Sequence, residues 1–166
     1  MNVKKMTFMA LLLAVALTIF VAEAQLPPPV PIAGVKLGLA NIVTLVALVW
    51  LGREEALAIL LGRILLGSLF AGQAVSFIYS LAGGLMCFFV MAIILAPLKQ
   101  ERLWVVSVFG AMAHNVGQII AAALLTHTWQ VIAYLPVLII SGILSGVFTG
   151  LAAQLVVKRL NKKDQK

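Results

Sequence analysis

Three ionisable side chains interrupt or border strongly apolar stretches of this chain. Glu23 ends one apolar stretch, Lys36 begins the next, and Arg63 lies deep in a third. Charged side chains are costly in hydrocarbon and usually face a bundle interior or a cavity. If all three approach one cavity, two cations and one carboxylate give it a net charge of +1, which suits a ligand with a carboxylate or phosphate. The alternative is an ion pair of Glu23 with Lys36 or Arg63 that only holds the adjoining loop.

Uncharged polar residues recur at helical spacing in three apolar stretches. These sets are Gln73, Ser76, Ser80, Gly83 and Cys87; Ser107, Ala111, His114 and Gln118, with Asn115 adjacent; and Asn41 with Thr44. Intervals of three and four residues place each set on one helix face. We therefore predict hydrogen-bonding faces around a common interior, with substrate-binding candidates Glu23, Lys36, Asn41, Arg63, Gln73, His114, Asn115 and Gln118. The alternative is a set of interhelical hydrogen bonds, which contribute about 0.6 kcal/mol each.

The residue types of this chain give little support to an enzymatic function. Prenyl-chain synthesis needs clustered aspartates that hold magnesium against a diphosphate, but the single aspartate is Asp164, near the C-terminus. No glycine-rich loop followed by lysine and serine or threonine is present, so ATP hydrolysis by that route is excluded. A single cysteine, Cys87, excludes an internal disulfide and a multi-cysteine metal site. We predict no catalytic residue, no metal site and no cofactor.

The elements that must position these residues are membrane-spanning helices. Hydrophobic residues make up 63% of the chain and charged residues 10%, with a mean hydropathy of +1.14, which excludes an ordinary soluble domain. A span needs roughly 20 apolar residues. We predict an all-α fold: a single integral membrane domain over 1–166, built as a six-transmembrane-helix bundle. The predicted spans are 6–24, 36–52, 55–71, 74–96, 103–125 and 131–157, with an outer loop at 25–35 and a basic cytoplasmic tail at 158–166.

The distribution of lysine and arginine predicts the orientation. In this six-span arrangement, ten of the twelve basic residues fall on one side: Lys4, Lys5, Arg53, Lys99, Arg102, Lys158, Arg159, Lys162, Lys163 and Lys166. Short loops rich in these residues stay in the cytoplasm, so both termini are predicted to be cytoplasmic. The net charge of +7 then reflects orientation and anionic lipid, and needs no nucleic-acid partner. Residues 1–24 also resemble a cleavable signal peptide, whose removal would leave five spans.

Two further patterns concern the outer loop and the helix contacts. Residues 26–41 form a proline-rich, lysine-bearing segment between apolar stretches. Non-helical chain at membrane depth survives only against protein or a water-filled cavity, so this segment is predicted to wall a pocket. Small residues four apart permit close helix approach in lipid; they occur at Ala10 and Ala14, and at Gly142, Gly146 and Gly150. For the glycines, packing inside the bundle is the favoured interpretation.

Several motifs resemble a known family. They are Gly34-Val-Lys-Leu-Gly-Leu-Ala-Asn-Ile42, Gly62-Arg-Ile-Leu-Leu-Gly-Ser68, His114-Asn-Val-Gly-Gln118 and Tyr134-Leu-Pro-Val-Leu-Ile-Ile-Ser-Gly142. Together they resemble the bacterial Gx transporter family, which is also labelled heptaprenyl diphosphate synthase component I. Its size and six-span layout are similar to the S components of energy-coupling factor (ECF) transporters. Tyr134, which opens the last motif, joins the substrate-binding candidates.

The resemblance implies a function but leaves two possibilities. As an S component, the chain would bind a small molecule in an outward pocket capped by the loop after the first span. Ala10 and Ala14 would then contact an ECF transmembrane coupling subunit, and separate ATPases would supply energy. The synthase label instead implies a noncatalytic membrane component of a heptaprenyl diphosphate synthase. Either protein would lie in the bacterial cytoplasmic membrane, and the substrate could be a vitamin, a flavin or an isoprenoid or quinone precursor.

Overall fold

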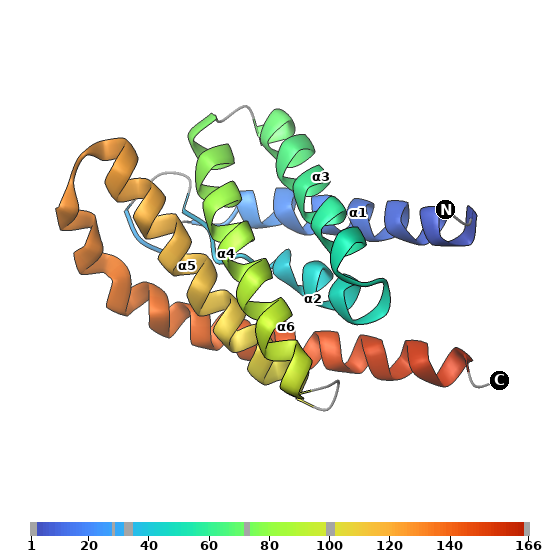
Figure 1. Cartoon of the computed structure of the whole chain (residues 1–166). Helices are drawn as coiled ribbons and strands as arrows, with labels where there is room; N and C mark the ends of the chain where they lie inside the picture. Colours follow the sequence, from blue (N-terminus) through green and yellow to red (C-terminus); the bar gives the residue numbers. More distant parts are fainter. Residues whose placement is uncertain (1–2, 28, 32–34, 72–73, 99–101, 165–166) are drawn as a thin grey trace.

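The computed structural model describes residues 3–27, 29–31, 35–71, 74–98 and 102–164, and all of its regular elements are helices (Figure 1). Apolar runs interrupted by glycine, proline or charge clusters give the helices their lengths. They are α1 (Val3–Ala24), α2 (Asn41–Trp50), α3 (Arg53–Ala71), α4 (Ala74–Leu98), α5 (Leu103–Thr126), the 3-10 helix η1 (Trp129–Tyr134) and α6 (Leu135–Asp164). The predicted all-α class is therefore confirmed.

Four helical segments are long and apolar enough to cross a membrane. They are Val3–Ala24, Val75–Leu98, Leu103–Thr126 and Trp129–Asn161. Large apolar side chains cover much of their outer surface, such as Ile93, Leu144 and Phe148. In water such a surface would be unstable, whereas in a bilayer it meets lipid of equal polarity. These features are compatible with a multi-pass membrane protein.

The second predicted span, 36–52, is wrong as a continuous helix. The helix α2 has only ten residues and is about 15 Å long at 1.5 Å per residue, half of a hydrocarbon core. Gly38 has a φ of +78° and Gly52 a φ of +110°, a left-handed region that glycine adopts readily and that breaks a right-handed helix. Chain without regular helix therefore precedes α2 at the level of the bundle interior.

Helix α3 matches the third predicted span in position but differs from the other long helices in composition. It begins with Arg53, Glu54 and Glu55 and carries Arg63 in its middle, and it is not among the four segments with span-like apolarity. Among the described residues, four segments thus have the length and apolarity of a membrane span, so the predicted count of six is not confirmed. The predicted C-terminal tail at 158–166 is also partly helical, because α6 continues to Asp164.

Close backbone contacts join α5 to both of its neighbours. A Cβ added at Gly146 would lie 2.6 Å from the Val108 Cα, and one at Gly150 would lie 2.5 Å from the Trp104 Cα. On the other side of α5, a Cβ at Gly117 would lie 2.7 Å from the carbonyl oxygen of Ala82 in α4. These glycines let helix backbones touch, as lipid-embedded helices require for tight association. They therefore serve packing inside the bundle.

Helix α1 begins and helix α6 ends at the same end of the bundle (Figure 1). There Lys5 forms an ion pair with Glu55 at the start of α3. The indole Nε1 of Trp50 donates a hydrogen bond of 3.2 Å to Asn161 Oδ1, and the rings of Phe8 and Trp50 lie 4.8 Å apart. Helix α5 ends at the opposite end of the molecule, whereas α1 ends nearer to its middle (Figure 1).

Candidate functional site

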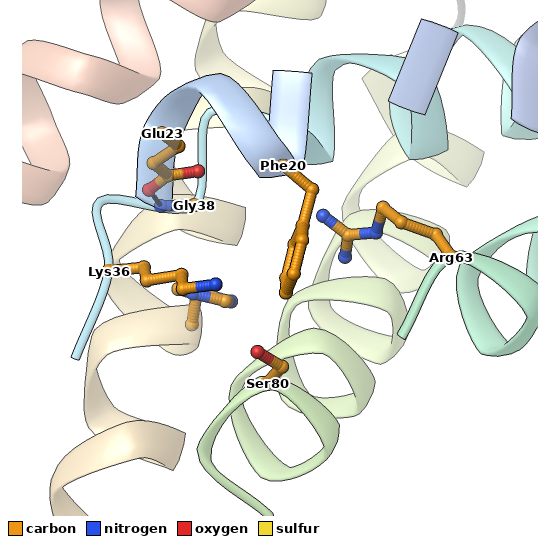
Figure 2. Close-up of a pocket in the computed structure, with 7 residues that line it drawn as sticks. Phe20, Glu23, Lys36, Gly38, Arg63 and Ser80 are labelled. Atoms are coloured by element: carbon orange, nitrogen blue, oxygen red, sulfur yellow. Dashed lines mark hydrogen bonds between the residues drawn. The ribbon is translucent and has the colours of Figure 1, made fainter. Parts of the chain in front are cut away.

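A small polar cavity lies between α1, α3, α4, α5 and the chain that precedes α2. It is lined by Phe20, Glu23, Lys36, Gly38, Arg63, Ser80 and His114 (Figure 2). The free space is sufficient for about one water molecule. The three ionisable residues singled out in the sequence thus do meet in one place, although the place is nearly filled by side chains.

Glu23 fixes the chain that leads into α2. Its side chain is buried, and its two carboxylate oxygens accept hydrogen bonds from the backbone N–H groups of Gly38, at 2.6 Å, and Leu39, at 3.0 Å. Charge-assisted bonds of this kind are roughly twice as strong as neutral ones. Glu23 forms no direct ion pair with Lys36 or Arg63 within the described part of the chain. Its negative charge therefore stabilises a backbone turn, and the two cations stay nearby.

Arg63 is buried in the middle of α3, with 3% of its surface exposed. Its Nη2 donates a hydrogen bond of 3.2 Å to Asn41 Oδ1 at the start of α2. Its Nε is buried and has no hydrogen-bond partner among the described residues. A guanidinium group has five N–H donors, so Arg63 retains donor capacity toward the cavity.

Phe20 lies between the two cations (Figure 2). The Lys36 Nζ is 3.4 Å from the centroid of the Phe20 ring, and the Arg63 Cζ is 6.0 Å from it. Both positions allow attraction between a cation and the electron-rich ring face. The Lys36 Nζ is buried and finds no hydrogen-bond acceptor in the part of the chain that the structure describes. The aromatic ring is therefore the main partner of this ammonium group.

His114 and Gln118 connect α5 to the same segment. The Gln118 side chain accepts a hydrogen bond of 3.0 Å from the backbone N–H of Lys36 and donates one of 2.5 Å to His114 Nε2. The imidazole ring packs against glycine: a Cβ added at Gly38 would lie 2.8 Å from His114 Cδ2, and one at Gly83 would lie 2.9 Å from Cε1. Both glycines therefore make room for the histidine at the cavity wall.

The remaining site candidates lie elsewhere. Asn115 is buried, but its Nδ2 donates a hydrogen bond of 2.5 Å to the carbonyl oxygen of Leu138, at the contact between α5 and α6. Ser107, on the same predicted face, bonds Thr149 of α6 at 2.9 Å. Tyr134 lies in η1 and is 37% exposed. The polar stripe of α5 is thus divided between the cavity and the contact with α6. The candidate Gln73, which precedes α4, lies outside the described residues.

Ala10 and Ala14 lie on an exposed face of α1. The next residue of this line, Thr18, is also exposed, and its hydroxyl donates a hydrogen bond of 2.9 Å to the carbonyl oxygen of Ala14. Since that bond satisfies the hydroxyl within the helix, the face offers lipid or a partner helix a smooth surface of small side chains.

Sequence reasoning left Phe20 and Gly38 out of the site and counted Ser80 only as part of a polar stripe. Phe20 precedes Glu23 by one helical turn, so the spacing i, i+3 would have placed both on one face. Gly38 follows Lys36 in the segment predicted to wall the pocket, but its backbone contact with Glu23 has no signature in the sequence. These two residues complete the enclosure around the cations.

The charges of the lining residues give the cavity its chemical character. Two cations and one carboxylate line it, and the carboxylate is occupied by backbone amides. The buried Cys87 is not among the lining residues. No group of three or more metal-ligating side chains occurs within the described ranges. The arrangement therefore offers positive charge and hydrogen-bond donors to an anionic group.

Comparison with known proteins gives one match. No curated protein and no solved structure matches this chain. A family model described as heptaprenyl diphosphate synthase component I matches residues 12–156, a range that includes every residue lining the cavity. This protein therefore belongs to the heptaprenyl diphosphate synthase component I family.

Proposed function

We propose that this protein is the substrate-binding membrane subunit of an uptake system for a small molecule. The observation that carries the proposal is the pair of buried cations at one cavity: Lys36 Nζ and Arg63 Nε both lack a hydrogen-bond acceptor among the described residues. Burying an unpaired charge is unfavourable, and a purely structural bundle has no need of two such groups at one point. An anionic ligand would give both a partner.

The proposed direction of binding is from outside to inside. The cavity lies in the half of the bundle that is remote from the chain termini, because Glu23 is at the end of α1. By the positive-inside rule, the basic residues near the termini support a cytoplasmic location for that end. The ligand would therefore enter from the outer face of the bacterial cytoplasmic membrane.

Energy for transport would come from partner subunits. The sequence contains no nucleotide-binding loop, so ATP hydrolysis would have to be supplied by separate ATPases through a membrane coupling subunit. The exposed small-residue face at Ala10 and Ala14 supports a close helix contact with such a subunit, because small side chains let helices approach in lipid.

Native mass spectrometry of the protein purified gently from its own host tests this function. We expect a bound metabolite, with ATPase and coupling subunits among the co-purifying proteins. Arg63→Met should lose the metabolite, whereas Arg102→Met, which removes an exposed arginine at the start of α5, should keep it. Absence of any bound metabolite from both the unmodified protein and Arg102→Met would contradict the proposal.

The family match favours a second candidate function, that of a noncatalytic membrane component of a heptaprenyl diphosphate synthase. In that case a soluble prenyltransferase would dock on the basic end of the bundle, where Lys4, Arg53, Lys158 and Arg159 are exposed. The same purification separates the two candidates. A co-purifying prenyltransferase with an empty cavity would favour the synthase component.

A further inference from the structure

Phe20 occupies the position between Lys36 and Arg63 that a bound anion would need. We infer that the cavity takes an oxyanion group, a carboxylate or a phosphate, and that this group displaces the Phe20 ring, which serves as a removable plug. The inference rests on the proposed ligand-binding function and specifies its ligand chemistry and the change that binding requires.

The first argument is geometric. The ring centroid is 3.4 Å from the Lys36 Nζ and 6.0 Å from the Arg63 Cζ, and Figure 2 shows the ring standing between the two side chains. When an oxyanion accepts a hydrogen bond of about 2.8 Å from each of two nitrogen atoms, those two nitrogen atoms can lie up to about 8 Å apart. With the ring withdrawn, one carboxylate or phosphate could therefore contact both cations.

The second argument concerns the strength of the alternatives. A ring face attracts a cation, but it offers no lone pair to the N–H groups, so Lys36 Nζ and Arg63 Nε remain without hydrogen-bond acceptors in the described structure. An oxyanion supplies both the charge and the acceptors. Replacing the ring by an oxyanion therefore improves the pairing of both cations at once.

The third argument is that this cavity has too little free space for an oxyanion while the Phe20 ring remains in place. The cavity has room for about one water molecule, and its backbone wall is fixed by Glu23 and Gln118 through the amides of Gly38, Leu39 and Lys36. The Phe20 ring is the largest apolar group lining the cavity. It also takes no part in those hydrogen bonds, so its movement breaks none of them.

Gly67 of α3 supports the ring from outside the cavity. A Cβ at Gly67 would lie 2.6 Å from the Phe20 Cδ1, so the ring is lodged directly against the α3 backbone. Gly67→Ala should therefore push the ring out of its resting position without any ligand. This variant provides an independent way to produce the displaced state.

Fluorine NMR of 4-fluorophenylalanine at position 20 tests the inference with a nearly isosteric probe. The full-length protein in neutral detergent is titrated with sodium phosphate and with sodium acetate, against sodium chloride at equal ionic strength. We expect a saturable shift of the fluorine resonance with phosphate or acetate and none with chloride. The same probe at Phe148, which is 70% exposed on α6, should not respond.

Charge-removing variants and a lipid comparison complete the experiment. Lys36→Met and Arg63→Met should each raise the half-saturating anion concentration by about tenfold or more, and Gly67→Ala should shift the resonance in the anion-free protein. Repeating the measurement in phosphatidylcholine vesicles with and without phosphatidylglycerol distinguishes a lipid phosphate from a soluble one. A resonance that ignores every anion, or that responds equally in Lys36→Met, would overturn the inference.

The outcome is separable from the test of the proposed function. If the metabolite is lost in Arg63→Met but no anion changes the fluorine signal, the uptake function is supported and the displacement of Phe20 by an anion is refuted. If the fluorine response is saturable but the protein co-purifies with no metabolite and no ATPases, the oxyanion site is supported and the uptake function is refuted.

Discussion

At the scale of single residues, Glu23 determines the conformation of the chain before α2. Its two carboxylate oxygens accept hydrogen bonds from the backbone N–H groups of Gly38 and Leu39. We predict that Glu23→Gln destabilises the protein by about 1.5–3 kcal/mol, because a charge-assisted bond is lost and the new amide nitrogen faces a donor. Thermal unfolding in detergent, followed by helical circular dichroism, measures the change.

Glu54→Gln is the matched control for this substitution. Glu54 is an exposed glutamate in the first turn of α3, where the helix dipole stabilises a carboxylate by about 0.3–1 kcal/mol. An equal loss of stability in the two variants would show that the backbone amides of Gly38 and Leu39 do not depend on Glu23.

The same scale shows how far the sequence predicts the site. Glu23, Lys36 and Arg63 could be identified because charge in an apolar stretch is costly, and the structure brings them to one cavity with Asn41 and His114 nearby. The spacing of Phe20 and Glu23 puts both on one helix face, but an aromatic residue in an apolar helix resembles core packing until its neighbours are known, so the spacing alone does not assign Phe20 to the site. The partners of Asn115 likewise depend on how α5 is rotated against α6.

At the scale of helices, the contact between α5 and α6 depends on glycine. Added Cβ atoms at Gly146 and Gly150 would lie within 2.6 Å of backbone atoms of α5, which cannot move as a flexible side chain can. We predict that Gly146→Ala and Gly150→Ala each destabilise the protein by about 1–3 kcal/mol through overpacking. Unfolding in a denaturing detergent, monitored by tryptophan fluorescence, measures the loss.

Gly62→Ala is the control within the same protein. A Cβ at Gly62 would lie 3.4 Å from a methyl group of Leu13, an ordinary contact, and alanine has a higher helix propensity than glycine by about 1 kcal/mol. This variant should be neutral or stabilising. If Gly146→Ala were as stable as Gly62→Ala, close approach of α5 and α6 would not be required.

The boundaries of α2 show why a continuous helix over 36–52 was a wrong prediction. Hydropathy predicts helices at the positions of α1, α4, α5 and α6 because each contains a predominantly apolar window as long as a membrane span. The stretch 36–52 is equally apolar, but Gly38 adopts a positive φ and Glu23 binds the amides of Gly38 and Leu39. The start of α2 thus depends on a contact with Glu23 in α1. The local spacing of apolar residues does not reveal this contact.

At the scale of the whole molecule, the orientation in the membrane is open to direct measurement. The native Cys87 is buried, so introduced cysteines can be labelled against a low background. We predict that Gln130→Cys, exposed in η1, reacts with a membrane-impermeant maleimide in intact cells. Arg159→Cys, exposed near the end of α6, should react only after permeabilisation, because the positive-inside rule predicts a cytoplasmic location for that lysine- and arginine-rich end.

The reverse labelling pattern would place the cavity on the cytoplasmic half and would contradict uptake from outside. Labelling of both positions in intact cells would show that the chain does not adopt a single orientation. Cysteine at Phe148, on the outer surface of α6, serves as a control that lipid should protect on both sides.

The position of Arg63 has a consequence for how the chain enters the bilayer. An arginine at the centre of an inserting helix costs about 2.5–3.5 kcal/mol, so α3 is a poor candidate for independent insertion, whereas α4, α5 and α6 form apolar segments that can enter one by one. Asn41 of α2 accepts a hydrogen bond from Arg63, and Phe20 of α1 lies near its guanidinium group. We therefore expect the first three helices to insert into the membrane as one cooperative unit, in which the residues that line the cavity also retain α3.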